Sequence, residues 1–384
     1  MLLLLNILMM VHLKQFYKII FIFSLVFLQL ESLSASSLSI FNPIAKTDRY
    51  NFLLETSIGN DFISLKEFPK KWERDYDPKD GTNIVILNNR IDIGMNLYNF
   101  YLGYAFRYDF FAKTDKSTTD LLELTKNKQD LPLNKKYKVN VEMYAIQTQS
   151  FILSKEIKWV NNNYQNINLY LGFSILLASM GQNGRVQADA DIVSKTDYDF
   201  IGESNYYYTF NHLYDLDVVK PKGYGYSLNF ALSYKNNKHS FLLLGEDIAS
   251  KIQWKDMPYS QISITSDTKK YDENGYVYYN PTITGYEQYR DYIQNLKGKY
   301  YFEYKYDFSK KIKTKIGAEL YQGFILPFGA IEYQKYDNTK YTLGYDIRFQ
   351  KFSVGLNIDN FSLIVSTNGI YKPSGVDIAL SYSY

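Results

Sequence analysis

Few side chains in this sequence could take part in covalent chemistry. The chain of 384 residues contains 3 His and no Cys, which excludes disulfides, thiolate metal sites and a lipid-modified N-terminal Cys. His12 lies in the first apolar stretch, and His212 and His239 are isolated in expected loops or turns. A nucleophile needs an adjacent base and a group that orients this base. We therefore predict no catalytic residues and no enzyme activity, and a lipase or protease is disfavoured.

Four carboxylates fall close together, at Asp189, Asp191, Asp197 and Asp199. Oxygen ligands of this kind suit a hard cation such as calcium. Their spacing departs from the Asp-x-Asp-x-Asp-Gly pattern of calcium loops, and a solvated acidic hairpin also explains them. We favour the hairpin and expect no metal and no cofactor.

Other charged residues occupy the polar side of segments whose second side is apolar. They are Arg107, Asp109, Lys313, Lys315, Glu319, Asp346 and Arg348. If these segments are strands of a membrane barrel, the charges line the lumen, because Arg or Lys facing lipid near the midplane costs about 2–4 kcal/mol. An interior with both signs is either a hydrated passage or a plug of salt bridges, and the sequence leaves both open.

From about residue 50 onward, apolar residues alternate with polar or small ones, which is the period of a β-strand. Between Phe100 and Phe110, every second residue is Phe, Leu or Tyr. Several such runs reach the ~9–11 residues that a tilted strand needs to cross a bilayer. Aromatic residues, 17% of the chain, favour strands and membrane interfaces. We predict an all-β fold, a transmembrane antiparallel up-and-down β-barrel of about 14 strands (roughly 12–16). A soluble sandwich is the alternative.

The C-terminal segment has one apolar face that ends on an aromatic residue. This face comprises Val376, Ile378, Leu380, Tyr382 and Tyr384. The segment resembles the closing strand of Gram-negative outer-membrane β-barrels. The resemblance implies that the last strand pairs with the first and that these residues form the insertion signal for the barrel-assembly machinery. It also implies contact with outer-membrane lipid and lipopolysaccharide.

Two lengths of connection are expected between the strands. Short turns at Tyr98-Asn99 and Gln350-Lys351 are predicted at the periplasmic end, and a bulge within one long strand at Asp359-Asn360. Longer polar segments are expected at the outer end of the barrel: 66–83, 113–136, 266–281 and 366–375. Residues 185–218 fit either a hairpin that projects beyond the membrane or a loop folded into the lumen.

The N-terminal residues 1–35 are predicted to be a cleaved signal peptide. Lys14 and Lys18 precede an apolar core at 19–30, and a stretch of small residues around Ala35 suits cleavage. This core is shorter than the ~20 residues of a membrane-spanning helix, which argues against an anchor. Residues 36–384 are then one domain, a barrel with extracellular loops, located in the outer membrane. The net charge of +3 is spread along the chain and gives no indication of nucleic-acid binding.

A second resemblance covers about residues 223–384. Residues 224–235, then 244–254 with Asp256 and Pro258, the strand 317–321 and the step Pro327-Phe328-Gly329 are similar to the later strands of the FadL-like family of fatty-acid transporters. The resemblance implies a fourteen-stranded barrel that moves hydrophobic compounds inward past an N-terminal plug. Residues 36–60 lack a plug segment of the Asn-Pro-Ala type beyond Asn42-Pro43, so no binding residues are carried over.

Two functions remain in competition after enzyme activity is disfavoured. The first is passive or facilitated diffusion of small solutes, hydrophobic ones included, with selection by lumen width and inward charges. The second is a non-transporting surface protein whose Tyr-rich loops around 271–292 bind a partner or a host surface.

Overall fold

The computed structural model describes residues 49–384 except 73–74, 99, 162–164, 211–217, 272 and 274–275. The predicted signal peptide 1–35, Asn42-Pro43, His12 and His212 lie outside the described residues. No helix within these ranges is long and apolar enough to cross a bilayer.

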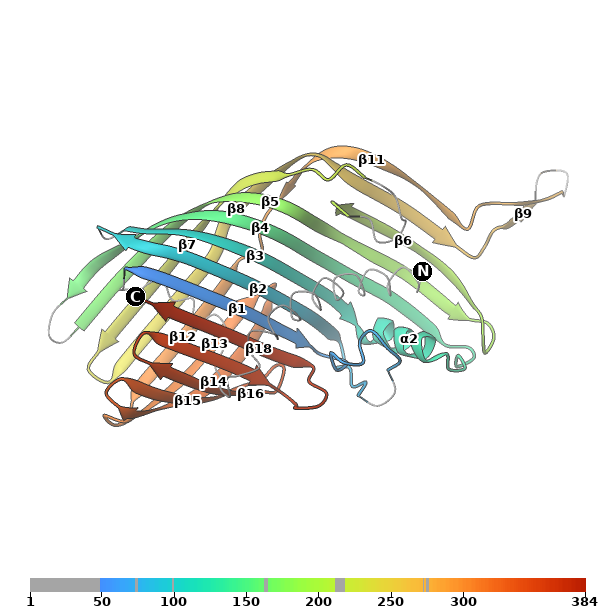
Figure 1. Ribbon diagram of the computed structural model, residues 1–384. Helices are drawn as coiled ribbons and strands as arrows, with labels where there is room; N and C mark the ends of the chain where they lie inside the picture. Colours follow the sequence, from blue (N-terminus) through green and yellow to red (C-terminus); the bar gives the residue numbers. More distant parts are fainter. Residues whose placement is uncertain are drawn as a thin grey trace.

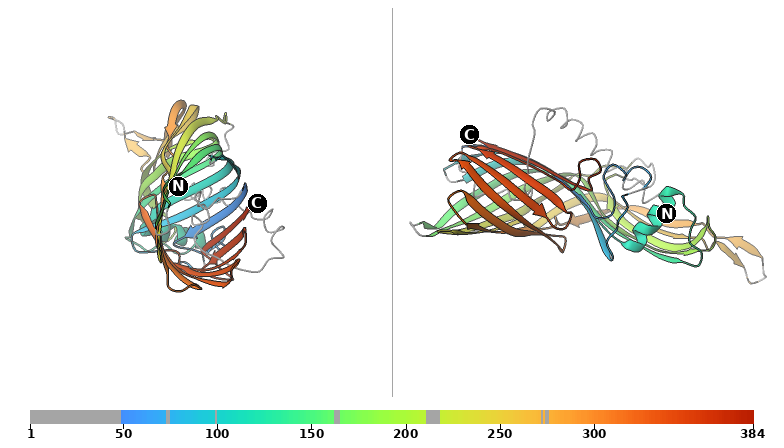
Figure 2. Two further views of the ribbon diagram at one scale, coloured as in Figure 1. Left: turned by 90° about the vertical axis from the view of Figure 1, so that its left-hand side faces the viewer. Right: turned by 90° about the horizontal axis from the view of Figure 1, so that it is seen from below.

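The described residues form a closed antiparallel β-barrel of 14 strands, as predicted (Figure 1; seen from one end in Figure 2, left). Because these strands pair in chain order and β18 pairs with β1, the ring has no open edge in this part. The strands are β1 (Tyr50–Asn60), β2 (Thr82–Leu97), β3 (Phe100–Asp115), β4 (Lys136–Asn161), β5 (Gln165–Ile192), β7 (Gly223–Asn236), β8 (His239–Thr265), β12 (Lys299–Asp307), β13 (Ile312–Tyr321), β14 (Phe324–Tyr336), β15 (Thr339–Asp346), β16 (Lys351–Ile358), β17 (Phe361–Thr367) and β18 (Gly375–Ser383).

The first and last strands close the ring, which confirms the pairing expected for the C-terminal segment. Leu54 of β1 lies opposite Leu380 of β18. At the end of the chain, the Tyr50 N–H donates to the Tyr384 carbonyl at 2.7 Å, and the Tyr384 N–H donates back at 2.8 Å. Tyr382 and Tyr384 are exposed on the outer face.

The outer face of the barrel is apolar and its inner face is polar or small. On β4, Phe151 and Leu153 are exposed, whereas Ser150 and Ser154 are buried. The same contrast recurs on most of the barrel strands, so large apolar side chains form a continuous outer belt. In water such a belt would be an aggregation surface, whereas in a bilayer it contacts lipid. The fold therefore indicates a membrane barrel, and the alternative of a soluble sandwich is wrong.

One side of the barrel wall continues far beyond the other. The strands β5, with 28 residues, and β8, with 27 residues, are much longer than a membrane-spanning strand requires. Their distal halves pair with β6 (Tyr198–Tyr208) and β11 (Ile283–Gln294). These strands project past the short strands β12–β18 (Figures 1 and 2), and we call this open, curved sheet the extension. Of the two arrangements considered for 185–218, the projecting hairpin of β5 and β6 is the one observed.

A small core covers the outer face of the extension. Odd-numbered residues of β4 remain on the outer side, because its pairing with β3 has no register shift. There Val139 and Val141 are buried under α2 (Lys116–Asn127) and the loop that contains Phe62 and Trp72. Asp115 caps the N-terminus of helix α2, because its carboxylate accepts from the Thr118 N–H at 2.7 Å. The apolar outer face, which faces lipid lower down, is thus covered by protein in the extension.

One predicted turn and the predicted bulge differ from what is observed. Asp346 pairs with Lys351, so residues 347–350 form the turn, and it lies at the same end as the long loops. The Asp346 carboxylate accepts from the Phe349 N–H at 3.0 Å, which folds Phe349 over the interior, where it is buried. At Asp359-Asn360 a two-residue hairpin joins β16 to β17, instead of a bulge, and Asp359 has a φ of 47°.

The Tyr-rich stretch 271–292 also differs from its prediction as a loop. A short hairpin of β9 (Lys269–Tyr271) and β10 (Val277–Tyr279) precedes strand β11. Pairing with β8 accounts for the strand, because the long β8 offers an unpaired edge above the end of β12.

Neighbouring residues of β15 test the orientation of the strands. Leu343 is 59% exposed on the outer face, whereas Thr342 is 4% exposed and pairs with Glu332 inside. We expect Leu343→Arg to impair insertion, because Arg facing lipid costs about 2–4 kcal/mol near the midplane, and Thr342→Arg to be tolerated. Membrane fractionation with heat-modifiable migration on gels measures the folded fraction. Leu343→Ile is the matched control, and equal folded fractions for the two Arg variants would contradict this orientation.

Candidate functional site

A bulge in β8 directs two consecutive carboxylates into the barrel. On the neighbouring strand β7, Leu228 pairs with Ala249 but Phe230 pairs with Gly245, so β8 carries extra residues between these points. Asp247 adopts a left-handed backbone with φ of 54°, and its N–H donates to the Asn229 side-chain oxygen at 2.8 Å. A regular strand would turn Glu246 and Asp247 to opposite faces, whereas the bulge places both inside, 5% and 3% exposed.

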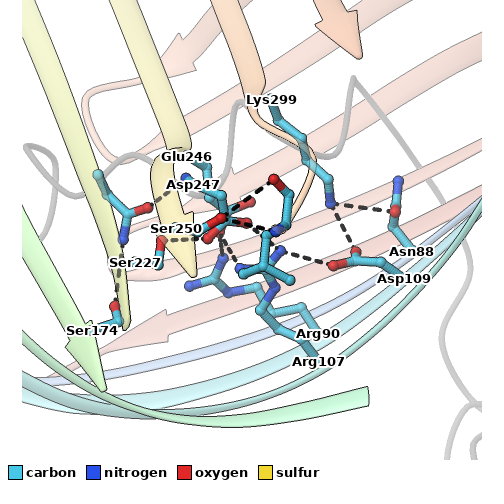
Figure 3. A network of polar contacts seen from close by, with 12 residues as sticks. Asn88, Arg90, Arg107, Asp109, Ser174, Ser227, Glu246, Asp247, Ser250 and Lys299 are labelled. Atoms are coloured by element: carbon cyan, nitrogen blue, oxygen red, sulfur yellow. Dashed lines mark hydrogen bonds and ion pairs between the residues drawn. The ribbon is translucent and has the colours of Figure 1, made fainter. Parts of the chain in front are cut away.

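Two guanidinium groups reach these carboxylates from the opposite wall (Figure 3). Arg90 on β2 pairs with Glu246 and also with Asp92, the latter at 3.2 Å. Arg107 on β3 lies 2.8 Å from Asp247 and 3.4 Å from Glu246. Because β4, β5 and β7 separate β3 from β8 along the wall, these ion pairs cross the interior of the barrel.

A third cation extends the network on the other side. Lys299 on β12 lies 2.9 Å from Asp109 on β3 and donates to the Asn88 side-chain oxygen at 3.3 Å. Asp109 also pairs with Arg107 at 2.8 Å. We call the connected set the lumen network; within the described residues it consists of Arg90, Asp92, Arg107, Asp109, Glu246, Asp247 and Lys299.

Burial makes the lumen network costly to disturb. Each of its ion-paired side chains is at most 8% exposed. Moving charges out of water is expensive, and pairing with good geometry offsets much of the cost, so loss of one partner typically destabilises by about 3–5 kcal/mol. The guanidinium groups suit this position because their planar donors serve several carboxylate oxygens at once. The network therefore ties two opposite walls of the barrel together.

Layers of different chemistry lie on either side of the network. Toward the extension the interior is apolar and aromatic, with Phe111 against Tyr321 at 5.7 Å between ring centroids and Trp254 fully buried. Toward the opposite end, the Tyr101 hydroxyl donates to Asp92 at 2.7 Å and the Tyr301 hydroxyl to Glu303 at 2.8 Å. A solute that entered the lumen from the extension would meet the apolar layer first and the charged layer next.

The seven residues that were predicted to line the lumen lie in different parts of the structure. Arg107 and Asp109 lie at the centre of the lumen network. Lys315 pairs with Glu332 at 3.1 Å on neighbouring strands, and Lys313 lies 3.6 Å from Asp307.

The remaining three predicted residues lie nearer to the loop end. Glu319 is buried in the interior at 8% exposure, and Asp346 lies 3.5 Å from Lys351. Arg348 does not belong to a strand, because β15 ends at Asp346; it lies in the turn 347–350 and pairs with Asp61 at the rim. The prediction that Arg348 continues the alternation of β15 is therefore wrong.

Five network residues were not predicted from the sequence: Arg90, Asp92, Glu246, Asp247 and Lys299. Arg90 and Asp92 carry a detectable signal, since they alternate with Ile91 and Ile93. Glu246 and Asp247 carry none under strict alternation, which would turn one of them toward lipid. Only the bulge reconciles the two carboxylates with one interior face.

The acidic cluster of β5 and β6 is engaged in local contacts. Asp191 pairs with Lys136 at 2.7 Å, and Asp197 accepts from the Tyr198 N–H at 2.9 Å. Among the described residues, no group of three or more His, Cys, Asp and Glu side chains is placed to hold a metal ion. His239 exchanges a hydrogen bond of 2.8 Å with the Tyr304 hydroxyl on the exposed surface.

No protein-family model and no curated protein sequence matches this chain. Among solved structures, it is similar to a "TodX deltaS2S3 mutant monoaromatic hydrocarbon channel", with a TM-score of 0.43 and 9% identity over 90% of this chain and 92% of the other. The toluene transporter TbuX of Ralstonia pickettii gives 0.32 and 9% over 92% and 95%. The outer-membrane protease OmpT of Escherichia coli gives 0.24 and 9% over 93% and 99%.

The first two of these structures are FadL-like channels, the group that the sequence resembles. Strand pairing from β1 round to β18 within this chain forms its barrel.

We expect the loss of a buried ion pair in the lumen network to lower the stability of the barrel far more than the loss of an exposed ion pair. Glu246→Ala should lower the free energy of unfolding by about 3–5 kcal/mol, because it leaves Arg90 and Arg107 buried without their shared carboxylate. Lys136→Ala, which removes an exposed pair with Asp191, should change the free energy of unfolding little, because solvent screens such a pair. Denaturant unfolding of the refolded barrel, followed by circular dichroism, measures both. A similar small cost for the two variants would show that the network contributes little to stability.

Proposed function

We propose that this protein is an outer-membrane transporter whose lumen passes small solutes when the lumen network rearranges. The observation that supports it best is the row of ion pairs from Arg90 and Arg107 to Glu246 and Asp247, which crosses the interior from wall to wall. Stability alone does not require such a row, since apolar packing in the same place is often as stable or more stable. A barrier that opens and closes requires charged groups that bind one another in the closed state and that water can solvate in the open state.

Hydration of the separated charges is the physical basis of the proposed opening. When Arg107 leaves Asp247, water entering the lumen replaces each lost contact, so the cost is that of exchanging protein partners for solvent. The bulge at Asp247 is the natural point of movement, because side chains hold it: its N–H donates to the Asn229 side-chain oxygen, and its carboxylate accepts from the Ser227 hydroxyl and from Arg107. Loss of the Arg107 contact leaves the left-handed backbone with Asn229 and Ser227 as the remaining two of these three side-chain partners. Passage then involves no covalent chemistry; lumen width and the inward charges select the solute.

The aromatic layer next to the extension and the charged layer formed by the lumen network together suggest the class of solute. The aromatic layer with Phe111, Trp254 and Tyr321 favours contact with apolar or amphipathic solutes. The charged layer beneath it admits only small solutes that move with water through the opened network. We therefore include small hydrophobic compounds among the solutes, in line with the FadL-like resemblance.

The outer membrane is the proposed location, reached by export with a signal peptide. The closed ring, the apolar belt and the closing strand from Val376 to Tyr384 are what an outer-membrane barrel needs for assembly. In this arrangement the extension faces outward beside the lipopolysaccharide, and the two-residue turns Asn237-Lys238 and Asp337-Asn338 face the periplasm.

A second candidate function is attachment to a partner outside the cell. It is favoured by Tyr286 and Tyr289 of β11, which are 47% and 53% exposed on the extension, since exposed Tyr is enriched at binding surfaces. In this case the lumen network would be a permanent plug.

Liposome swelling distinguishes the two functions. We expect the wild-type barrel to admit small sugars slowly, and the double variant Glu246→Ser with Asp247→Ser to admit them several-fold faster, because it removes the carboxylates that bind Arg90 and Arg107. The matched control is Asp189→Ser with Glu203→Ser, which removes two carboxylates from the extension and should leave the rate unchanged. Liposomes that stay impermeable with both wild-type and double-variant barrels, each shown to be folded, would rule out the transporter and leave the surface protein.

A further inference from the structure

One side chain separates two hollow regions at the loop end of the barrel. A pocket of about 390 Å³, which we call the rim pocket, is lined by Asp61, Lys79, Arg348 and Phe349 among other residues. A cavity of about 30 Å³, the inner cavity, lies inside the barrel, and Phe349 lines it as well. Within the described part of the chain, Phe349 is the only residue that borders both regions. Its side chain therefore forms the partition between them.

The inner cavity reaches the lumen network. Asn88, whose side-chain oxygen accepts from Lys299 of the network, lines this cavity together with Ser353 and Asp377. Hydrogen-bonding side chains also line the rim pocket. A path from the rim through the two regions would thus be polar on both sides, and one aromatic ring interrupts it.

The ring of Phe349 packs closely against the barrel wall. It is 5% exposed, and a Cβ atom added to Gly59 of β1 would lie 2.5 Å from it, so the ring occupies the space that a side chain at position 59 would need. The ammonium of Lys79, which lines the rim pocket, lies 5.8 Å from the ring centroid, and that of Lys351, which lines the inner cavity, lies 5.3 Å from it. Contacts between a cation and an aromatic ring stabilise this closed position.

We infer that Phe349 is a gate between the rim pocket and the lumen network, and that the passage it closes takes water and small polar solutes. The polar lining on both sides of the ring sets this class of solute. As a step in transport the gate rests on the proposed function, where it stands in series with the lumen network.

The position of Phe349 in a turn allows the ring to move alone. Residues 347–350 lie outside the pairing of β15 with β16, and side chains hold their backbone. The Asn368 amide donates to the Phe349 carbonyl at 3.0 Å, and the Lys79 ammonium donates to the Arg348 carbonyl at 2.8 Å. Rotation of the ring to another staggered χ1 conformer breaks none of these backbone contacts. One side chain can therefore open the passage while the barrel stays intact.

Thiol labelling tests whether the ring blocks access. The chain contains no Cys, so a single introduced Cys reports on one position. Ser353→Cys places it on the inner cavity, where Ser353 is 5% exposed. The refolded full-length barrel is treated with a methanethiosulfonate that carries a trimethylammonium group, and mass spectrometry follows the labelled fraction. We expect slow labelling with Phe349 in place and about tenfold faster labelling when Phe349→Ala is added, because the reaction requires access to the thiol.

Two controls separate removal of the gate from a general loosening of the barrel. Phe352→Ala makes the same truncation on the outer face, where Phe352 is 69% exposed, and it should leave labelling at position 353 unchanged. Ser150→Cys places the thiol on the buried inner face of β4, where it lines neither region, and its labelling should stay slow with Phe349→Ala. Equal rates at position 353 with and without the Phe349 ring would overturn the gate, and so would faster labelling at position 150.

A smaller truncation keeps the test decisive if Phe349→Ala does not fold, as judged by heat-modifiable migration. Phe349→Leu retains an apolar side chain but loses the ring, so labelling at position 353 should again be faster, and an unchanged rate would overturn the gate. Labelling measures access and not transport. Liposomes that stay impermeable would therefore count against the transporter alone, whereas equal labelling rates would count against the gate alone.

Discussion

Closure of the sheet between β1 and β18 is the constraint on which the rest of the structure depends. Lipid offers no hydrogen-bond partners, so an open sheet edge at membrane depth would leave a row of costly unsatisfied groups. The bonds between Tyr50 and Tyr384 complete the ring at the end of the chain. Once the ring is closed, each strand has a fixed inner and outer side. The positions of the lumen network and of the apolar belt both follow from that assignment.

The same alternation serves two environments in succession. Along β4, Phe151 and Leu153 face outward where lipid covers them, and Val139 and Val141 face outward where α2 and the loop with Trp72 cover them. The alternation of apolar and polar residues continues where the strand leaves the membrane. Only the material that covers its apolar side changes, from lipid to protein. This explains why the only α-helix of the described residues is found here, on the outer face of the extension, above the belt.

Sequence alternation was sufficient for the class of fold and for much of its detail. The period of two, the length of the runs and the aromatic C-terminus led to a membrane barrel of the strand number observed, with the last strand paired to the first. The pattern succeeds because lipid and lumen impose opposite requirements on every second residue. It failed where the chain leaves a strand: at 347–350 a carboxylate of Asp346 sets the turn, and at Asp359-Asn360 a left-handed residue closes a hairpin. In both cases a local hydrogen bond or backbone conformation overrides the apolar period.

The interior of the barrel was beyond the reach of the sequence. Arg107 and Asp109 were expected to face inward, but their partners Asp247 and Lys299 are distant in the chain and come from the opposite wall. Glu246 and Asp247 share one face only because of the bulge in β8. The sequence by itself determined which side of each strand faces lipid, because that choice depends on single residues and their spacing. The tertiary structure alone decided which charges meet, because ion pairing depends on the curvature of the ring and on the bulge, which no spacing along the chain records.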